Sequence, residues 1–170
     1  MDAPSSAIAA HDIAQACAQA MWAEDQASQG LGMVIERVSP GEAVISMPIR
    51  PDMTNGHGIC HGGFIFSLAD SAFAFACNSY NQRTVAQHCA VTFLQPGRRG
   101  DTLTAHAVER NRSGRSGIYD VTVRNGKGEA VAEFRGHSRT ITGTLLGREA
   151  VAIPNKNERM GGSFASDSAP

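Results

Sequence analysis

The chain has 170 residues, of which 42% are hydrophobic and 18% are charged, and its formal net charge is -1. This composition indicates one domain that is large enough to bury a core. Lys and Arg form no sustained cluster, and no apolar run reaches the roughly 18 residues that span a bilayer, so we expect neither a nucleic-acid partner nor a membrane partner.

Two further features bear on the cellular compartment. The N-terminus has no basic segment followed by an apolar stretch, so it does not read as a secretory signal. The four cysteines, Cys17, Cys60, Cys77 and Cys89, are irregularly spaced, which argues against a disulfide framework. We therefore expect a reduced, cytoplasmic protein.

The first third of the chain predicts a helix followed by a hairpin. Residues 7–28 are rich in Ala and Gln, and Ile13, Cys17 and Met21 recur every four positions, which is typical of an amphipathic helix ending near Gly30. Residues 32–49 predict two strands around a Pro-Gly turn. Residues 1–30 are thus expected to be an N-terminal helix of the same domain.

The rest of the chain predicts one long helix followed by strands. Turn-forming residues fill positions 50–63, residues 61–80 are almost wholly apolar, and three β-rich segments follow at 84–96, 101–111 and 117–142, the last folded at Asn-Gly. The hydrophobic pattern decays from Gly143, so we expect a core over 31–143 and a disordered tail over 144–170.

The apolar helix contains one carboxylate, Asp70. A helix that is apolar on every side must be surrounded by protein, and an antiparallel sheet curling around it would provide that surround. A buried carboxylate is costly unless it is hydrogen-bonded, paired or open to a cleft. Asp70 therefore bonds a nearby hydroxyl, such as Ser67 or Ser71, bonds a backbone amide across an interface, or belongs to a functional site.

The start of the same helix offers a candidate oxyanion hole. His61-Gly62-Gly63 places unpaired N–H groups at the positive end of the helix dipole, and a glycine lets a carbonyl approach the amide closely. Asp70 lies eight residues beyond Gly62, roughly 12 Å along a helix. If both groups act on one carbonyl carbon, a second subunit must supply one of them, so the chemistry predicts a dimer.

These residues resemble a known family. The pattern Asn55-x5-His61-Gly62-Gly63-x4-Leu68-Ala69-Asp70, followed by FLQPGRRGDTLTA and GIYDVTV, resembles the hotdog-fold acyl-CoA thioesterases of the phenylacetate-degradation (PaaI) type. The likeness runs from about Met21 to Gly143. It implies an α+β hotdog fold, in which a curved antiparallel sheet wraps a long central helix, and a homodimer with shared active sites, usually within a homotetramer.

The resemblance also implies roles for residues. Gly62 would polarise the thioester carbonyl, Asp70 of the facing subunit would be the general base or nucleophile, and Asn55 and His61 would shape the site. The substrate would be phenylacetyl-CoA or a ring-hydroxylated relative, hydrolysed without a cofactor. A thioester is a reactive acyl donor, so no serine nucleophile is required, and no GxSxG motif is present.

Binding of the CoA phosphates requires cations or amide donors near the mouth of the site. Gly63 and the turn ERNRSGRSG, with its arginines Arg110, Arg112 and Arg115, are the candidates, although a solvated basic turn explains the three arginines equally well. Related enzymes often carry a small hydroxyl or amide residue on the strand after the helix. This chain has Gln87 and His88 there, to which we assign no role.

Other functions remain open at this point. His57, Cys60 and His61 could ligate a metal, but a fourth ligand with usable spacing is missing, so we expect no metal site. A hydratase of acyl thioesters would need a catalytic His paired with Asp or Glu in motifs that are not present. A non-catalytic acyl-CoA-binding module, or a thioesterase for other aliphatic or aromatic acyl groups, are the remaining alternatives.

Overall fold

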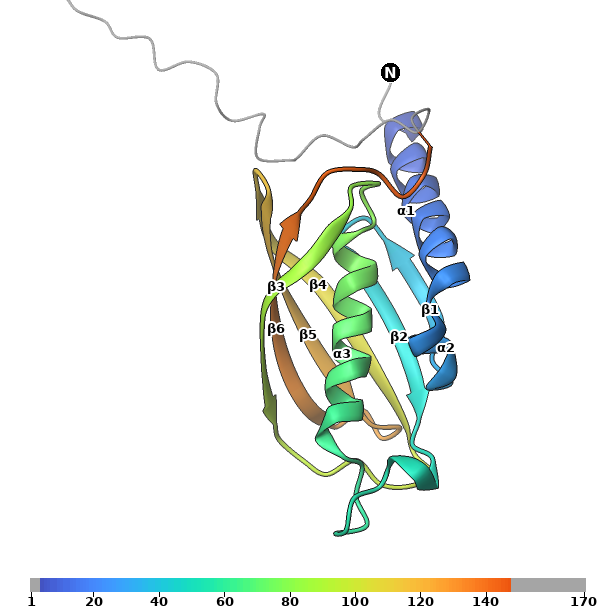
Figure 1. Cartoon of the computed structure of the whole chain (residues 1–170), viewed down its shortest axis with the longest axis vertical. Helices are drawn as coiled ribbons and strands as arrows, with labels where there is room; N and C mark the ends of the chain where they lie inside the picture. Colours follow the sequence, from blue (N-terminus) through green and yellow to red (C-terminus); the bar gives the residue numbers. More distant parts are fainter. Residues whose placement is uncertain (1–3, 148–170) are drawn as a thin grey trace, which may run out of the picture.

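The computed structural model describes residues 4–147, with side chains from residue 10. A six-stranded antiparallel sheet in the order β1-β2-β4-β5-β6-β3 curves around one long helix, α3 (Figure 1). The elements are α1 (Pro4–Glu24), α2 (Gln26–Gly30), β1 (Val34–Ser39), β2 (Glu42–Pro48), the 3-10 turn η1 (Pro51–Met53), α3 (Gly62–Cys77), β3 (Thr84–Phe93), β4 (Thr102–Ser113), β5 (Ser116–Arg124) and β6 (Ala130–Thr140). The expected α+β hotdog arrangement is confirmed.

The N-terminal segment contains two helices, whereas the sequence predicted one. Asp25 interrupts the helix because its side chain accepts a hydrogen bond from the N–H of Ser28 at 2.9 Å and so caps a new helix, α2. α2 ends at Gly30, close to the predicted position. The apolar face predicted from Ile13, Cys17 and Met21 is confirmed in part, because Cys17 is buried and Met21 packs against the core.

The hairpin predicted in the first third of the chain is confirmed. β1 and β2 pair with Ser39 opposite Glu42, and Gly41 takes a φ of +74° in the turn between them. The Asn125-Gly126 turn likewise joins β5 to β6, and the side-chain oxygen of Asn125 accepts N–H bonds from Lys127 and Glu129. The predicted tail from residue 144 lies mostly outside the described residues.

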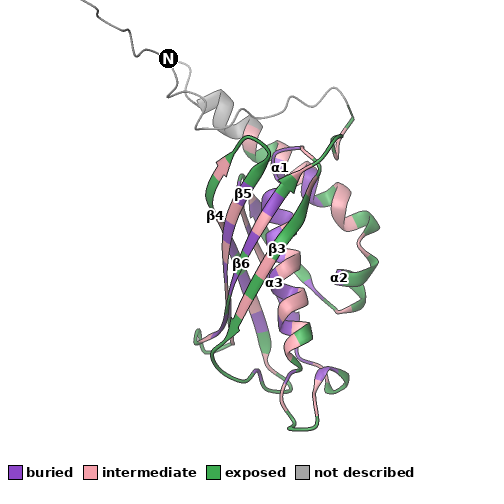
Figure 2. Ribbon diagram, turned by 60° about the vertical axis from the view of Figure 1, so that its left-hand side comes forward, coloured by how far each residue is buried: buried purple, intermediate pink, exposed green. Residues whose placement is uncertain are grey.

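α3 fills the concave face of the sheet, but the sheet of one chain leaves a strip of it open. Phe73 is buried against Tyr119 and Phe134, with ring centroids 5.5 and 5.9 Å away. Phe66 and Asp70 are only half-buried, and Figure 2 shows that α3 carries such half-buried positions along its length. The expectation that α3 is surrounded on every side therefore does not hold for one chain.

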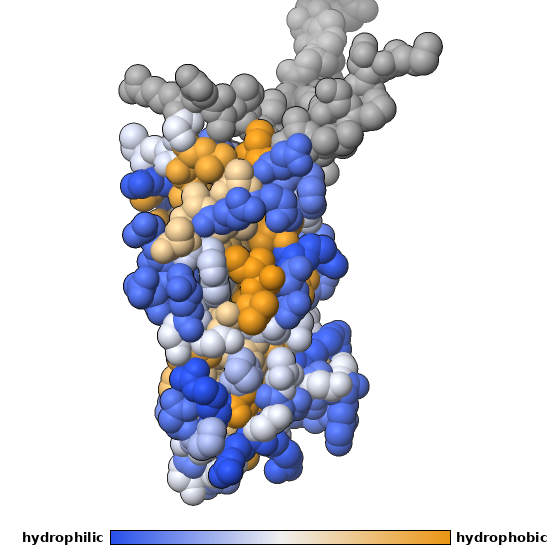
Figure 3. Space-filling model, turned by 90° about the vertical axis from the view of Figure 1, so that its right-hand side faces the viewer, coloured by the Kyte–Doolittle hydropathy of each residue, from blue (hydrophilic) through white to orange (hydrophobic). Residues whose placement is uncertain are grey.

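An apolar hollow lies between α1 and β1. Its volume is about 330 Å³, and Figure 3, which views the molecule from the α1 side, shows apolar surface on this face between hydrophilic regions. The lining residues include Trp22, Met33 and Val34. No helix within residues 4–147 is both long enough and apolar enough to cross a membrane.

The packing of Phe73 gives a stability prediction. Gly136 on β6 faces this ring, and a Cβ at position 136 would lie 2.8 Å from two ring carbons of a side chain that is 1% exposed. Gly136→Ala is expected to lower the free energy of unfolding by about 1–3 kcal/mol, measured by urea denaturation. Gly30→Ala is the matched control, because nothing lies within 4 Å of its Cβ. Equal free energies of unfolding for Gly136→Ala and Gly30→Ala would contradict the close packing of Phe73 on Gly136.

Candidate active site

The first turn of α3 presents one free backbone N–H. His61 is the N-cap, and its Nδ1 accepts the N–H of Gly63 at 3.0 Å. Among the described residues, no hydrogen bond uses the N–H of Gly62, which lies at the positive end of the helix dipole. Gly62 thus offers the donor that the sequence predicted, while the N–H of Gly63 is engaged within the chain.

Gly62 lines a pocket of about 480 Å³. Apolar side chains form most of its wall, and the complete lining is Asn55, Ile59, Cys60, Gly62, Ile65, Phe93, Leu94, Gln95 and Pro96. The preceding loop is held in place because the N–H of His61 donates to the carbonyl of Met53 at 2.8 Å. The pocket therefore brings together Asn55 and Gly62, two of the predicted site residues.

Asn55 shapes the loop that leads into α3. Its side-chain oxygen accepts the N–H groups of His57 and Ile59 at 3.0 and 3.4 Å, which fixes the turn between them. No hydrogen bond within the described residues uses the Nδ2 group of Asn55. That group is available as a second donor in the pocket.

Phe93 packs directly on Gly62. A Cβ at position 62 would lie 2.8 Å from Cζ, at the far end of the Phe93 ring, so an added methyl group would require only that exposed ring to shift. The Phe93 side chain nevertheless remains 51% exposed, on the pocket side of the last strand in the sheet. Sequence reasoning did not identify Phe93 as a site residue.

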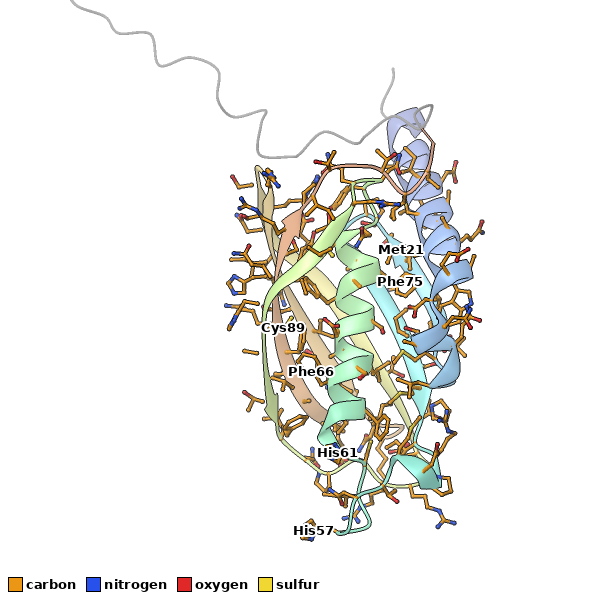
Figure 4. All side chains as sticks on the ribbon, viewed as in Figure 1. Met21, His57, His61, Phe66, Phe75 and Cys89 are labelled. Atoms are coloured by element: carbon orange, nitrogen blue, oxygen red, sulfur yellow. The ribbon has the colours of Figure 1, made fainter. Side chains whose placement is uncertain are left out.

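Asp70 lies farther along α3 and outside this pocket. Its Oδ1 accepts a long hydrogen bond of 3.9 Å from the Cys89 thiol of β3, and Figure 4 shows Cys89 on β3 beside the helix. Neither neighbouring serine bonds the carboxylate, because Ser67 donates to the Gly63 carbonyl at 2.8 Å and Ser71 lies 2.9 Å from the Ser28 hydroxyl. The hydroxyl-bonded alternative for Asp70 is therefore wrong.

Burial raises the pKa of the Asp70 carboxyl above its ordinary value, and the Cys89 thiol partly opposes this shift. A carboxylate of raised pKa is a stronger base once it is ionised. Asp70 and Gly62 belong to one uninterrupted helix, Gly62–Cys77, so the eight residues between them correspond to roughly 12 Å. One chain does not bring both groups to the same carbonyl carbon.

The three predicted arginines lie near the C-terminal end of α3, away from Gly62. The Arg112 guanidinium stacks 3.7 Å from the ring centre of Tyr80, which follows that end, and lies 3.6 Å from Glu109. Arg110 pairs with Asp120 at 2.9 Å. The structure does not bring these two side chains to the pocket of their own chain.

The third arginine, Arg115, donates to the carbonyl of Thr140 at 3.0 Å, also at the far end of α3. Arg98 and Arg99, by contrast, are exposed and follow Pro96 at the rim of the pocket. Neither of these two takes part in an ion pair within residues 4–147. Sequence reasoning overlooked them, although the pair stands in the FLQPGRRGDTLTA motif.

The residues of the alternative metal site do not converge on one point. His57 lies exposed at the tip of the loop, as Figure 4 shows, while His61 caps the helix. Cys60 is buried, and its thiol contacts the carbonyl of His61 at 3.7 Å. Between residues 4 and 147, no three His, Cys, Asp or Glu side chains gather closely enough to hold a metal ion.

Residues 57–132 match the model of the thioesterase superfamily. The acyl-coenzyme A thioesterase PaaI of Escherichia coli strain K12 is 46% identical over 130 residues, which cover 76% of this chain and 93% of that protein. The chain belongs to the PaaI-type acyl-CoA thioesterases of the thioesterase superfamily. The resemblance read from the motif around Asp70 is confirmed.

Solved structures agree with this PaaI-type membership. The E. coli PaaI protein from the phenylacetic acid degradation operon superposes with a TM-score of 0.78 at 45% identity, over 79% of this chain and 97% of that one. The TT0310 protein of Thermus thermophilus gives a TM-score of 0.65 at 39% identity, over 67% and 96% of the two chains.

Within this PaaI-type fold, the structure identifies the strand residue that faces Asp70. A bulge between Ala86 and His88 sets the register of β3, and His88 lies opposite His137 with ring centroids 5.6 Å apart. Because side chains alternate along a strand, His88 points away from α3 and Cys89 points toward it. The alternating apolar side chains of Cys89, Val91 and Phe93 were the available signal in the sequence.

Proposed function

We propose that the chain hydrolyses phenylacetyl-CoA, or a ring-hydroxylated phenylacetyl-CoA, to the free acid and CoA. The observation that carries this proposal is the free N–H of Gly62 at the start of α3, in a largely apolar pocket. The E. coli relative's name, acyl-coenzyme A thioesterase PaaI, and its origin in the phenylacetic acid degradation operon support the substrate class.

The proposed reaction uses Gly62 and Asp70 of two different subunits. The thioester carbonyl accepts the N–H of Gly62, which stabilises the oxyanion as the carbonyl carbon becomes tetrahedral. Asp70 of the partner subunit takes a proton from water, whose oxygen bonds to that carbon. The C–S bond then breaks, the sulfur of CoA receives the proton, and the free acid leaves. Direct attack by the carboxylate, followed by hydrolysis of the anhydride, has the same overall balance.

Two neighbouring residues assist in this proposal. His61 fixes the first turn of α3 by accepting the N–H of Gly63, so that the N–H of Gly62 stays directed into the pocket. Asn55 has its Nδ2 group available to orient the attacking water or the carbonyl oxygen, because its side-chain oxygen is held by the loop. These roles make His61 a positioning residue and Asn55 a direct contact of the reacting groups.

The unpaired edge of β3 supports a dimer. β3 is the last strand of the sheet, it has ten residues, and its Val85 side chain is 46% exposed. A long exposed strand with apolar side chains is a template for pairing with another strand. We therefore propose that β3 pairs with β3 of a second copy, which makes one continuous sheet and places the two α3 helices side by side.

The positions along α3 fix where the twofold axis would pass. Phe66 lies midway between Gly62 and Asp70, on the strip that one chain leaves half-exposed. An axis near Phe66 would place Gly62 of each chain opposite Asp70 of the other. Gly62 and Asp70 lie roughly 12 Å apart within one chain, but Gly62 of one chain would then lie close to Asp70 of the other.

β3 independently fits the same axis. Cys89 contacts Asp70 and Phe93 packs on Gly62, so the strand runs alongside α3 in the opposite direction. The four residues from Cys89 to Phe93 cover about 13 Å, nearly the length from Asp70 to Gly62. Their midpoint is Val91. Antiparallel pairing of two β3 strands about Val91 therefore agrees with helices related about Phe66.

The CoA phosphates are proposed to bind between the two chains. Arg98 and Arg99 supply exposed cations at the rim of the pocket. With this twofold axis, the two α3 helices run antiparallel, and the C-terminal end of the partner's α3 extends about 10 Å beyond the first residue of this chain's α3. The arginines of the 109–117 segment of the partner subunit would then lie on the opposite side of the rim, where they would provide the predicted charge. Two such dimers are proposed to form the homotetramer.

Thiol release tests the proposed function. Phenylacetyl-CoA and hydroxyphenylacetyl-CoA are expected to be hydrolysed with kcat/KM about tenfold above that of butyryl-CoA and decanoyl-CoA, in line with the phenylacetic acid degradation operon of the E. coli relative. Release would be followed with a chromogenic thiol reagent, and binding by calorimetry. Binding of all four without release would favour the non-catalytic acyl-CoA-binding module, and preferred hydrolysis of an aliphatic chain would contradict the aromatic substrate.

A further inference from the structure

Cys89 is the residue of β3 that reaches the carboxylate of Asp70. Its thiol lies 3.9 Å from Oδ1, and no hydrogen bond among the described residues uses Oδ2. Cys77, on the same helix as Asp70, directs its own thiol to the carbonyl of Ala74 at 3.5 Å. One oxygen of Asp70 is thus contacted from β3, and the other is without a hydrogen bond within residues 4–147.

We propose that Cys89 is a positioning residue for Asp70, whose thiol donates to Oδ1 and so directs Oδ2 toward the water attacking at Gly62 of the partner subunit. This inference rests on the proposed function and names a residue to which the motif assigns no role. The contact joins two elements, α3 and β3, so it fixes the carboxylate against the strand that forms the proposed dimer edge. Rotation of the Asp70 side chain would break it.

A thiol suits this position because it is a weak donor. It restrains the carboxylate while lowering its basicity less than a hydroxyl or a guanidinium would. Burial, together with the neighbouring Asp70 charge, raises the pKa of Cys89 to about 11, so the thiol keeps its proton at neutral pH. Burial also raises the pKa of the Cys77 thiol, so Cys77 stays neutral as well. The other side chains that point inward near Asp70, Phe66 and Val91, have no titratable group.

Steady-state kinetics of two variants across pH test this inference. Cys89→Ala is expected to lower kcat by roughly three- to tenfold with KM changed less than about twofold, because one restraining hydrogen bond is lost. The acid limb of the kcat profile should move to higher pH, because the thiol lowers the pKa of Asp70. Cys89→Ser keeps a donor and is expected to retain most of kcat, with no upward movement of that limb.

His88→Ala is the matched control, because His88 is next to Cys89 on β3 and points to the other face of the sheet. It should leave the acid limb of the profile unchanged. Wild-type kcat and an unmoved acid limb in Cys89→Ala, in an enzyme that hydrolyses acyl-CoA, would overturn the role of Cys89 alone. Absence of hydrolysis by the wild-type protein would instead overturn the proposed function, and the inference with it.

Discussion

Replacement of Asp70 by asparagine is expected to lower kcat for phenylacetyl-CoA hydrolysis by at least about 100-fold, since the variant lacks the base that takes the proton from water. Asparagine has the same shape as aspartate, so the half-buried site stays filled. KM should change little, because Asp70 activates the water and makes no contact that holds the acyl group before the reaction. Thiol release at saturating substrate is the measurement, and turnover at the wild-type rate would contradict the proposed mechanism.

The same variant carries its own test of folding. Burial raises the pKa of Asp70 in the folded protein above its unfolded value. Proton binding at this site therefore favours the folded state, and ionisation weakens it as pH rises through the unfolded and then the folded pKa. Asp70→Asn removes that cost at pH 7. Its unfolding midpoint should equal or exceed that of the wild type, and a lower midpoint would mean that Asp70 stabilises the fold.

Much of the fold was predictable because local patterns specified it. The apolar run around Asp70 indicated a wrapped helix, and turn-forming residues at Gly41 and Asn125 marked two hairpins that the structure confirms. The break at Asp25 was missed because the Ala- and Gln-rich pattern continues past it. Only the side-chain cap to Ser28 shows that a second helix begins there.

The location of the predicted arginines was harder to infer. Arg112 lies near the end of β4, whose twelve residues extend about 40 Å from the pocket end to the far end of α3. Composition indicated a basic turn, but it holds no information on which end of the helix that turn approaches. The rim residues Arg98 and Arg99 carry no distinctive sequence signal, because a pair of exposed cations is common in loops.

The strand at residues 84–96 was predicted, but Cys89, its residue that faces Asp70, was missed for a different reason. The apolar alternation of Cys89, Val91 and Phe93 covers only the second half of β3, and the bulge after Ala86 breaks the alternation in the first half. Phe93 was overlooked because its contact with Gly62 joins residues 31 positions apart in the chain. Such contacts depend on the tertiary fold.

Substitution of Gly62 by proline is expected to reduce turnover by about 100-fold or more, because it removes the N–H that stabilises the oxyanion. Proline fits the first position of a helix, and His61 already has the extended conformation that precedes proline, with φ -62° and ψ 133°. Gly62→Ala is the matched control. It adds the same Cβ against Phe93 but keeps the N–H, so a greater loss in the proline variant isolates the amide.

Heterodimers of defined composition test most directly whether each active site is shared between two chains. Dimers with one Gly62→Pro chain and one Asp70→Asn chain, isolated through two affinity tags, would contain one intact site and should retain about half of the wild-type activity. Dimers of a wild-type chain with a chain carrying both substitutions would contain no intact site and should be nearly inactive. The reverse pattern, an inactive first heterodimer and a half-active second one, would contradict the shared site.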